Sequence, residues 1–182
     1  LRDAALDELG EHVEGRTLQV ACVYGDLTAR LRRRLGAGAR LDIVDILPVQ
    51  LRNLARKMPA DDRVAMLQGD SASLSMPDAS YDQVLLFFLL HEQPEPVRRA
   101  TLAEAMRVVK PGGKIVIVDY HQPVRRHPMR PVLWAVFRML EPFAMDLWTR
   151  GVEAYLPREV APANVRKSTY FGDVYQKLVL TR

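Results

Sequence analysis

The stretch of sequence that decides the fold runs from residue 107 to residue 119 and reads Arg107-Val108-Val109-Lys110-Pro111-Gly112-Gly113-Lys114-Ile115-Val116-Ile117-Val118-Asp119. Proline cannot continue a helix and adjacent glycines permit a tight turn, so Pro111 to Gly113 ends a helix predicted over residues 96–109. The β-branched run that follows, from Lys114 to Asp119, predicts a buried strand. A helix that passes through a short turn into an apolar strand is one unit of an alternating α/β sheet.

The same alternation of helix and strand extends in both directions from this stretch. Short apolar runs predict strands over residues 18–24, 41–45, 63–67 and 82–90. Helical periodicity predicts helices over about residues 1–13, 26–35 and 48–57. Beyond residue 125 a long helical stretch is followed by two strands, over 165–171 and 174–181, which Gly172-Asp173 joins as a hairpin.

These units predict one doubly wound α/β domain over residues 1–182. Right-handed crossovers place the strands in the order 3-2-1-4-5, and the C-terminal hairpin adds antiparallel strands at the edge. We therefore expect a seven-stranded, mostly parallel Rossmann-like sheet, with a helical cap over residues 122–160 between strands five and six. The ligand of such a sheet binds at the carboxyl ends of the strands.

Composition excludes several classes of protein. The chain has 182 residues, and 26 Lys and Arg against 22 Asp and Glu leave a net charge of +4, which gives no reason to expect a nucleic-acid partner. A hydrophobic fraction of 48% excludes a disordered or fibrous chain. The single cysteine, Cys22, excludes an internal disulfide and favours a reducing, cytoplasmic compartment. The chain opens at Leu1 in what reads as the middle of a helix, so we expect a missing N-terminal segment.

The first strand-to-helix turn reads Gln19-Val20-Ala21-Cys22-Val23-Tyr24-Gly25-Asp26. It resembles the opening motif of class I S-adenosylmethionine-dependent methyltransferases, in which an acidic residue precedes Gly-x-Gly-x-Gly. Gln19 stands in place of the acid, and Ala21 and Val23 replace two glycines, so only Gly25 remains. The resemblance makes Ala21, Val23, Tyr24 and Gly25 candidate contacts of the co-substrate.

Other strand ends carry further candidates for this binding site. Asp45 ends the second strand, where its carboxylate can accept hydrogen bonds from ribose hydroxyls, although it can also cap the next helix. Asp70 and Ser71 follow the third strand, where the family contacts adenine, although they can also form a surface turn. We add Ile46 and Phe88 to the predicted co-substrate site. The turn at residues 107–114 resembles the family's R-x-L-K-P-G-G turn, whose role is structural: the proline ends the helix and the glycines form the tight turn.

Imidazoles and carboxylates follow the fourth and fifth strands. His91 and Glu92 come after the fourth, and Asp119 and His121 close the fifth. Neighbouring strand ends bring such groups together, and a mixed nitrogen and oxygen set suits Mn²⁺, Fe²⁺ or Zn²⁺, or acid–base chemistry. The plain alternative is that His91 packs and hydrogen-bonds in its loop without any metal.

The cap region combines basic and aromatic residues. Arg125, Arg126 and Arg130 precede the apolar stretch 132–148, which contains Trp134 and Trp148. Such a stretch fits a helix lying in a membrane interface, or a cap helix packed on the sheet that receives a lipid-like substrate. Both readings can hold together.

A closer resemblance covers nearly the whole chain. Residues 15–120 resemble quinone-biosynthesis methyltransferases in general. The chain is identified as a member of the rhodoquinone biosynthesis methyltransferase-like family on four segments: Val20–Asp26, Phe87–Pro94, Val118–His121 and Tyr175–Lys177.

The resemblance to this family implies an unusual reaction. A methoxy group of ubiquinone is replaced by an amino group, with S-adenosylmethionine as amino donor and Mn²⁺ as the metal. It implies Tyr24, His91 and His121 as catalytic residues. His91, Glu92, Asp119 and His121 are the implied metal ligands, and a site on the cytoplasmic side of the inner membrane is implied with them. Two alternatives stay open: an ordinary methyltransferase acting on a quinone or small aromatic, and a non-catalytic quinone- or lipid-binding module.

Overall fold

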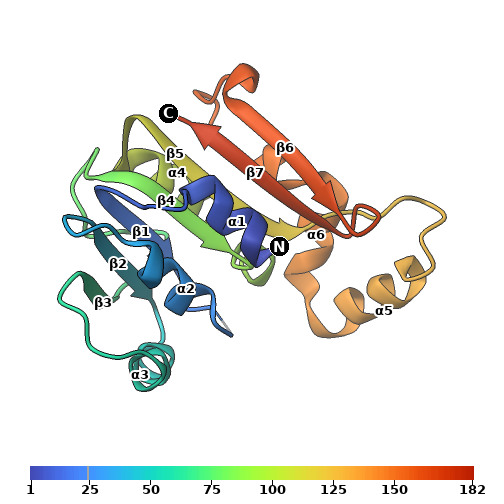
Figure 1. Cartoon of the computed structure of the whole chain (residues 1–182). Coiled ribbons are helices and arrows are strands. Elements are labelled where there is room, and N and C mark those ends of the chain that lie inside the picture. Colours follow the sequence, from blue (N-terminus) through green and yellow to red (C-terminus); the bar gives the residue numbers. More distant parts are fainter. Residues whose placement is uncertain (24) are drawn as a thin grey trace.

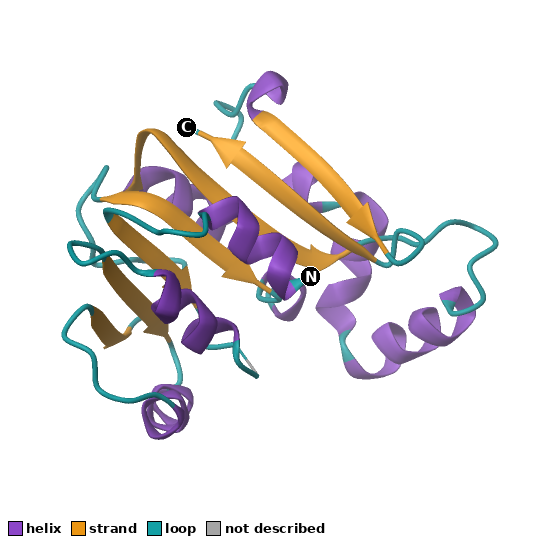
Figure 2. Ribbon diagram, in the orientation of Figure 1, coloured by secondary structure: helices purple, strands orange, loops and turns teal. Residues whose placement is uncertain are grey.

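The computed structural model describes residues 1–23 and 25–182, and it contains one seven-stranded sheet in the order β3-β2-β1-β4-β5-β7-β6 (Figures 1 and 2). The strands are β1 (Arg16–Val20), β2 (Arg40–Asp45), β3 (Val64–Gln68), β4 (Tyr81–Phe87), β5 (Val109–Tyr120), β6 (Val165–Tyr170) and β7 (Tyr175–Thr181). Strands β1 to β5 are parallel, and β7 is antiparallel to β5 and β6. The predicted fold class, with its strand order, is confirmed.

Helices cover both faces of the sheet. The helices are α1 (Arg2–Leu9), α2 (Leu27–Arg34), α3 (Pro48–Lys57), α4 (Glu95–Val108), α5 (Arg130–Leu140) and α6 (Pro142–Arg150), with short 3-10 helices η1 (Leu90–Glu92), η2 (Val152–Tyr155) and η3 (Pro162–Asn164). None of the described helices is long and apolar enough to cross a membrane.

The alternation of side chains in β4 divides the core into two layers. Val84 and Leu86 pack with α4, α6 and η2, whereas Leu85 and Phe87 pack with α1, α2 and α3. All four are at most 5% exposed. A strand covered on both faces needs apolar residues at every position, which explains the continuous apolar run seen in the sequence.

Several predicted boundaries are wrong, and each has a local cause. The first strand ends at Val20 because Ala21 adopts a left-handed φ of 72°, and the fourth ends at Phe87 because Phe88 has a φ of 54°. The first helix ends before Gly10, whose φ is 113°. The long helical stretch is two helices, since Pro142 has no N–H with which to continue α5.

The glycine pair near the start of β5 makes a close approach to β4. The strand begins at Val109, which pairs with Tyr81, and a bulge precedes the regular pairing at Gln83. A Cβ on Gly113 would lie 2.8 Å from the carbonyl oxygen of Asp82, so only glycine fits there. The predicted fold-determining turn therefore sets the register of the two central strands.

Candidate functional site

A cavity of about 1220 Å³ opens along the carboxyl ends of the parallel strands. Most residues predicted to bind the co-substrate line it: Ala21, Val23, Asp45, Ile46, Asp70, Ser71 and Phe88. We call residues 21–23, 45–47 and 69–71 the turn half of the cavity. We call Phe88, His91, Tyr120, Phe171 and Tyr175, which also line it, the aromatic half.

Asp45 ties the first two turns together. Its Oδ2 accepts the Cys22 N–H at 2.7 Å, and its Oδ1 accepts the Leu47 N–H at 2.8 Å. Each carboxylate oxygen has a second lone pair, so Asp45 retains acceptor capacity toward the cavity. Burial and the nearby Asp45 charge raise the pKa of the Cys22 thiol to about 12, which keeps it protonated and unreactive.

The first turn keeps a glycine-like shape without glycine. Ala21 holds its positive φ while its N–H donates to the Val44 carbonyl at 2.7 Å. The buried Gln19 amide donates to the Ala21 carbonyl and to the Thr28 hydroxyl, each at 3.0 Å. Gln19, which stands where the methyltransferase motif has an acidic residue, therefore stabilises the first turn through its neutral amide.

The other two residues of this turn that the sequence predicts as contacts of the co-substrate are Gly25 and Tyr24. Gly25 does not line the cavity, and a Cβ there would collide with the guanidinium of Arg2. Gly25 also has a φ of 93°, a conformation that favours glycine, and its predicted contact with the co-substrate stays a prediction. Tyr24 lies outside the described residues, so its predicted binding and catalytic roles stay predictions.

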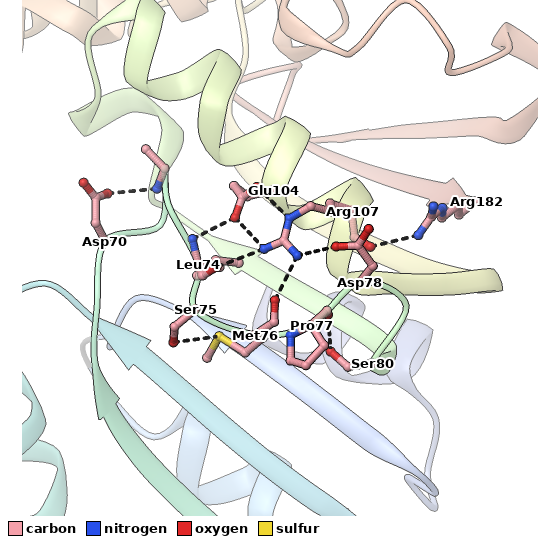
Figure 3. Close-up of polar contacts among 11 residues, drawn as sticks. Asp70, Leu74, Ser75, Met76, Pro77, Asp78, Ser80, Glu104, Arg107 and Arg182 are labelled. Atoms are coloured by element: carbon pink, nitrogen blue, oxygen red, sulfur yellow. Dashed lines mark hydrogen bonds and ion pairs between the residues drawn. The ribbon is translucent and has the colours of Figure 1, made fainter.

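The loop after β3 is fastened to α4 by one arginine (Figure 3). The Arg107 guanidinium donates to the Glu104 and Asp78 carboxylates and to the carbonyls of Leu74 and Met76, at 2.6 to 2.9 Å. Glu104 in turn accepts the Leu74 N–H at 2.7 Å. Arg107 begins the fold-determining turn, and its side chain also shapes the loop that carries Asp70 and Ser71.

The two predicted polar residues of this loop differ in their surroundings. Asp70 is exposed, and its Oδ1 accepts the Ala72 N–H at 2.8 Å in a tight local turn. The Ser71 hydroxyl lies 2.8 Å from the Thr101 hydroxyl and accepts from the Gln93 amide at 3.0 Å. Ser71 therefore joins the turn half to the loop after β4.

The aromatic half is a cluster of ring contacts from separate segments. Tyr120 and Tyr175 are register partners on β5 and β7, and their rings stack at 5.7 Å with a 27° angle between planes. Phe88 meets both edge-on, at 5.4 and 5.6 Å, and Phe171 meets Tyr175 at 5.8 Å. Such a wall favours a flat aromatic ligand, because rings pack best against ring faces and edges.

His91 and Asp119 form a buried dyad beside these rings. His91 Nδ1 lies 2.8 Å from Asp119 Oδ1, and the carboxylate is fully buried. Asp119 also accepts N–H groups from Leu90 at 2.9 Å and from Tyr120 at 2.8 Å. These bonds hold the imidazole with Nδ1 toward Asp119, which leaves Nε2 for the cavity side.

Two further carboxylates face the other ring nitrogen of His91. Glu92 Oε1 lies 3.9 Å and Glu141 Oε2 4.0 Å from His91 Nε2. Burial lowers the pKa of His91, but the Asp119 hydrogen bond and charge, with Glu92 and Glu141, outweigh it, so the pKa is raised above the ordinary 6.5. Glu141 Oε2 is buried and has no hydrogen-bond partner among the described residues.

The predicted metal site is not assembled. Asp119 is enclosed by hydrogen-bond donors, and His121 lies outside the cavity with its Nδ1 3.0 Å from the Asp173 carbonyl oxygen. Within residues 1–23 and 25–182, no group of three or more His, Cys, Asp or Glu side chains is arranged to hold a metal. As arranged, the donor set of His91, Glu92, Asp119 and His121 does not fit a metal ion, and the predicted catalytic role of His121 stays a prediction.

Arg98 positions the loop that carries His91. It is fully buried, and it donates to the carbonyls of Leu90, Gln93 and Phe143, each at 2.8 Å, while its guanidinium lies 4.5 Å from the Tyr155 ring centroid. This one cation joins α4, η1 and α6. Sequence reasoning missed it because arginine on a helix usually indicates a solvated face.

Comparison with protein families and curated proteins points to one enzyme class. Residues 17–113 match the model of a family described as "Methyltransferase domain". The demethylmenaquinone methyltransferase of Staphylococcus aureus (strain MRSA252) is 27% identical over 155 residues, which are 85% of this chain and 63% of that protein. The chain thus spans less than two thirds of that relative's length.

Solved structures share the fold at low sequence identity. The N-methyltransferase NodS from Bradyrhizobium japonicum WM9, also solved with S-adenosyl-L-homocysteine, superposes with a TM-score of 0.71 at 14% identity, over 98% of this chain and 92% of that one. The [4+2]-cyclase SpnF superposes with a TM-score of 0.62 at 15% identity, over 100% of this chain and 80% of that one. The fold therefore carries more than one chemistry, and the site has to decide between them.

Proposed function

Because this chain belongs to the methyltransferase domain family, in which S-adenosylmethionine is the co-substrate, we propose that it transfers a methyl group from S-adenosylmethionine to a quinone or a related small aromatic. One observation carries the proposal: a single cavity has a hydrogen-bonding turn half and an aromatic half with a His91–Asp119 dyad. The demethylmenaquinone methyltransferase relative supports a quinone as acceptor, and ubiquinone-type rings belong to the same class.

In this proposal the turn half binds the nucleoside part of the donor. Asp45 accepts from the ribose hydroxyls with its remaining lone pairs, and the loop at Asp70 and Ser71 lies against adenine. Ile46 is 59% exposed at the cavity edge and adds apolar contact with the base. The donor sulfonium then faces the aromatic half.

In the aromatic half, the acceptor ring packs against Tyr120, Tyr175 and Phe88. The neutral His91 Nε2 takes a proton from the hydroxyl or ring carbon that receives the methyl group. The acceptor atom forms a bond to the methyl carbon, the sulfur–methyl bond breaks, and its electron pair stays on sulfur. Asp119 stabilises the resulting imidazolium, and Glu141, 4.0 Å from Nε2, adds to that stabilisation.

A second candidate is the amination that the rhodoquinone family resemblance implies. It is favoured by one observation, the presence of Ala21 and Val23 on the cavity wall where the methyltransferase motif has glycines. Their side chains narrow the space beside the methionine part of the donor, which favours a different donor pose. In that reaction the donor's amine nitrogen adds at the methoxy-bearing carbon and methanol leaves. The electron pair of the bond between nitrogen and the donor's α-carbon then passes to nitrogen while the donor's β-carbon loses a proton, which leaves the aminoquinone and an alkene derived from the donor.

One product assay tests the proposal against this candidate. The chain is incubated with S-adenosylmethionine carrying ¹⁵N in its amine and deuterium in its methyl group, with either a demethylated quinone or a methoxyquinone analogue, and with and without Mn²⁺. Deuterium in the quinone supports methyl transfer. Nitrogen label with loss of methoxy establishes amination instead. Donor binding in calorimetry without transfer of either label would contradict both and indicate a binding module.

The first turn supplies a sharper version of this test. The variant Val23→Gly restores a glycine of the motif on the cavity wall. If the side chain sets the donor pose, we expect the ratio of methylated to aminated product to rise in this variant. An unchanged ratio would contradict a role for Val23 in selecting the transferred group.

A further inference from the structure

Helix α5 and the start of α6 carry an apolar stripe on the surface. It comprises Val132, Val136, Met139, Leu140 and Phe143, which are 38% to 79% exposed. The first four repeat at helical spacing and so share one side of α5. Leu133 and Phe137 on the neighbouring side pack inward, Phe137 against Trp148 and Tyr120. The helix is therefore apolar both toward the protein and toward solvent.

Arginines are frequent in the segment that carries this stripe. Arg125, Arg126 and Arg138 form no ion pair with any described residue, and Arg138 lies over the Trp134 ring at 5.1 Å. Residues 122–150 contain five arginines against two acidic side chains, whereas the other 153 residues contain 21 basic and 20 acidic ones. The segment that carries the stripe therefore holds three of the chain's four net positive charges.

A second cavity lies between the loop before α5, α5 itself and α6. It has a volume of about 520 Å³, and its lining includes Arg125, Arg130, Trp134, Trp148 and Thr149. Two guanidiniums next to a partly exposed indole form a pocket suited to an anionic headgroup, because arginine binds phosphate in a fork and indole favours the membrane interface.

We propose that α5, the start of α6 and the loop 122–129 dock on a bilayer that contains anionic phospholipid. The apolar stripe enters the acyl boundary, and the arginines and the second cavity contact lipid phosphates. The charge of the segment decides the occupant, because an apolar stripe on a segment of net positive charge matches an anionic lipid surface. Figure 1 shows α5 projecting beyond the sheet, free to lie on such a plane.

The same helix borders the candidate active site. Met129 and Leu133 line the main cavity, while Val132 and Val136 stand on the exposed stripe. A lipid-tailed acceptor can therefore pass from the bilayer to the aromatic half along one helix. This route rests on the proposed function, whereas the docking does not, because vesicle binding requires no turnover.

The test measures binding of the whole chain to 100 nm vesicles by co-sedimentation. Vesicles of phosphatidylcholine with 30% phosphatidylglycerol are compared with phosphatidylcholine alone. We expect M139S/L140S to weaken binding to the anionic vesicles by about 10-fold or more, because both side chains leave the acyl boundary. We expect R125E/R126E to weaken it by about 25-fold or more. Brominated lipid should quench Trp134, and the variant Trp134→Phe should lose most of that quenching.

A matched control reverses two arginines elsewhere. Helix α3 lies at the opposite end of the molecule from α5 (Figure 1), and its Arg52 and Arg56 line neither cavity. R52E/R56E should therefore bind within about 2-fold of wild type. Equal binding to neutral and anionic vesicles, an equal loss in R52E/R56E, or an unquenched Trp134 would overturn the proposal. S-adenosyl-L-homocysteine binding, measured in parallel, verifies that each variant is folded and keeps failure of docking separate from failure of the proposed function.

Discussion

The two halves of the main cavity are built in different ways. The turn half consists of short turns that follow consecutive parallel strands, and backbone hydrogen bonds to Asp45 and the Arg107 cluster fix it. The aromatic half collects side chains from the loop after β4, the end of β5 and the β6–β7 hairpin. The shape of the turn half therefore depends on the order of strands and turns along the chain, whereas the shape of the aromatic half depends on packing between segments far apart in the sequence.

This difference predicts where substitutions act. Changes in the turn half should alter donor binding and leave the fold intact, because each turn is held by several backbone bonds. Changes beneath the aromatic half should affect stability and catalysis together, because single side chains such as Arg98 join three elements there.

The largest effect is expected at Arg98. The substitution Arg98→Met leaves two buried carbonyls and one partly buried carbonyl without their donor. At roughly 1.5 kcal/mol for each charge-assisted bond we expect a loss of about 4 kcal/mol in unfolding free energy. Urea unfolding measures it. The neighbouring Arg99, exposed and paired with Glu95, is the control, and Arg99→Met should cost less than about 1 kcal/mol. Similar losses for both would contradict the assigned role of Arg98.

The next effect concerns the dyad. In Asp119→Asn the charge that raises the His91 pKa is removed while burial, which lowers it, remains, so the pKa falls. His91 acts as a base in its neutral form, so activity rises with pH through this pKa. The acid limb of the kcat/KM profile should therefore move to lower pH, and the maximal rate should fall about 100-fold.

Glu92 is the control for the dyad, because its side chain is 67% exposed and lies 3.9 Å from His91 Nε2. We expect Glu92→Gln to change the maximal rate by less than about 5-fold, since an exposed charge is screened by solvent. If the acid limb stays in place in Asp119→Asn while the variant remains folded and binds donor, His91 is not the base.

A smaller effect is expected in the turn half. Asp45→Asn removes the charge that holds the Cys22 N–H and receives the ribose in our proposal. Calorimetry should show S-adenosyl-L-homocysteine binding about 10-fold weaker, with the unfolding midpoint little changed. The exposed Asp62, outside the cavity, is the control, and Asp62→Asn should bind as wild type does. Unchanged affinity in Asp45→Asn would remove the ribose assignment.

The smallest effect is expected at Ala21. Glycine relieves the left-handed strain of an alanine, worth about 1 kcal/mol, but it also adds freedom to the unfolded chain, which costs about the same. We expect Ala21→Gly to change the unfolding free energy by less than about 0.5 kcal/mol. A change larger than 2 kcal/mol would mean that the Ala21 methyl group, and not the turn geometry, holds the first turn.

The sheet and the turn half could be predicted from the sequence because both follow from chain order. Strand periodicity located the ends of the second and third strands to within one residue, and so it located Asp45 and Asp70 at one edge of the sheet. The metal set failed because strand-end position does not specify side-chain direction. Asp119 points into the fold toward His91 and backbone donors, and His121 leaves the cavity.

The missed residues depend on tertiary packing. Tyr175 enters the site because β7 pairs beside β5. In the sequence it is part of a predicted hairpin strand and of a segment that carries the family resemblance, and neither places it in the site. Glu141 reaches His91 because the chain bends between α5 and α6. Pro142 signals that bend in the sequence, but no sequence pattern indicates which strand end the bend will face.

The most direct test of the two-half cavity is photolabelling with an azidoquinone in the presence and absence of saturating S-adenosyl-L-homocysteine, followed by peptide mapping. We predict covalent label on Tyr120, Phe171 or Tyr175, with a yield that the donor product does not reduce. Label on residues 21–23 or 45–47 that S-adenosyl-L-homocysteine displaces would contradict the account, because quinone and donor would then compete for one half of the cavity.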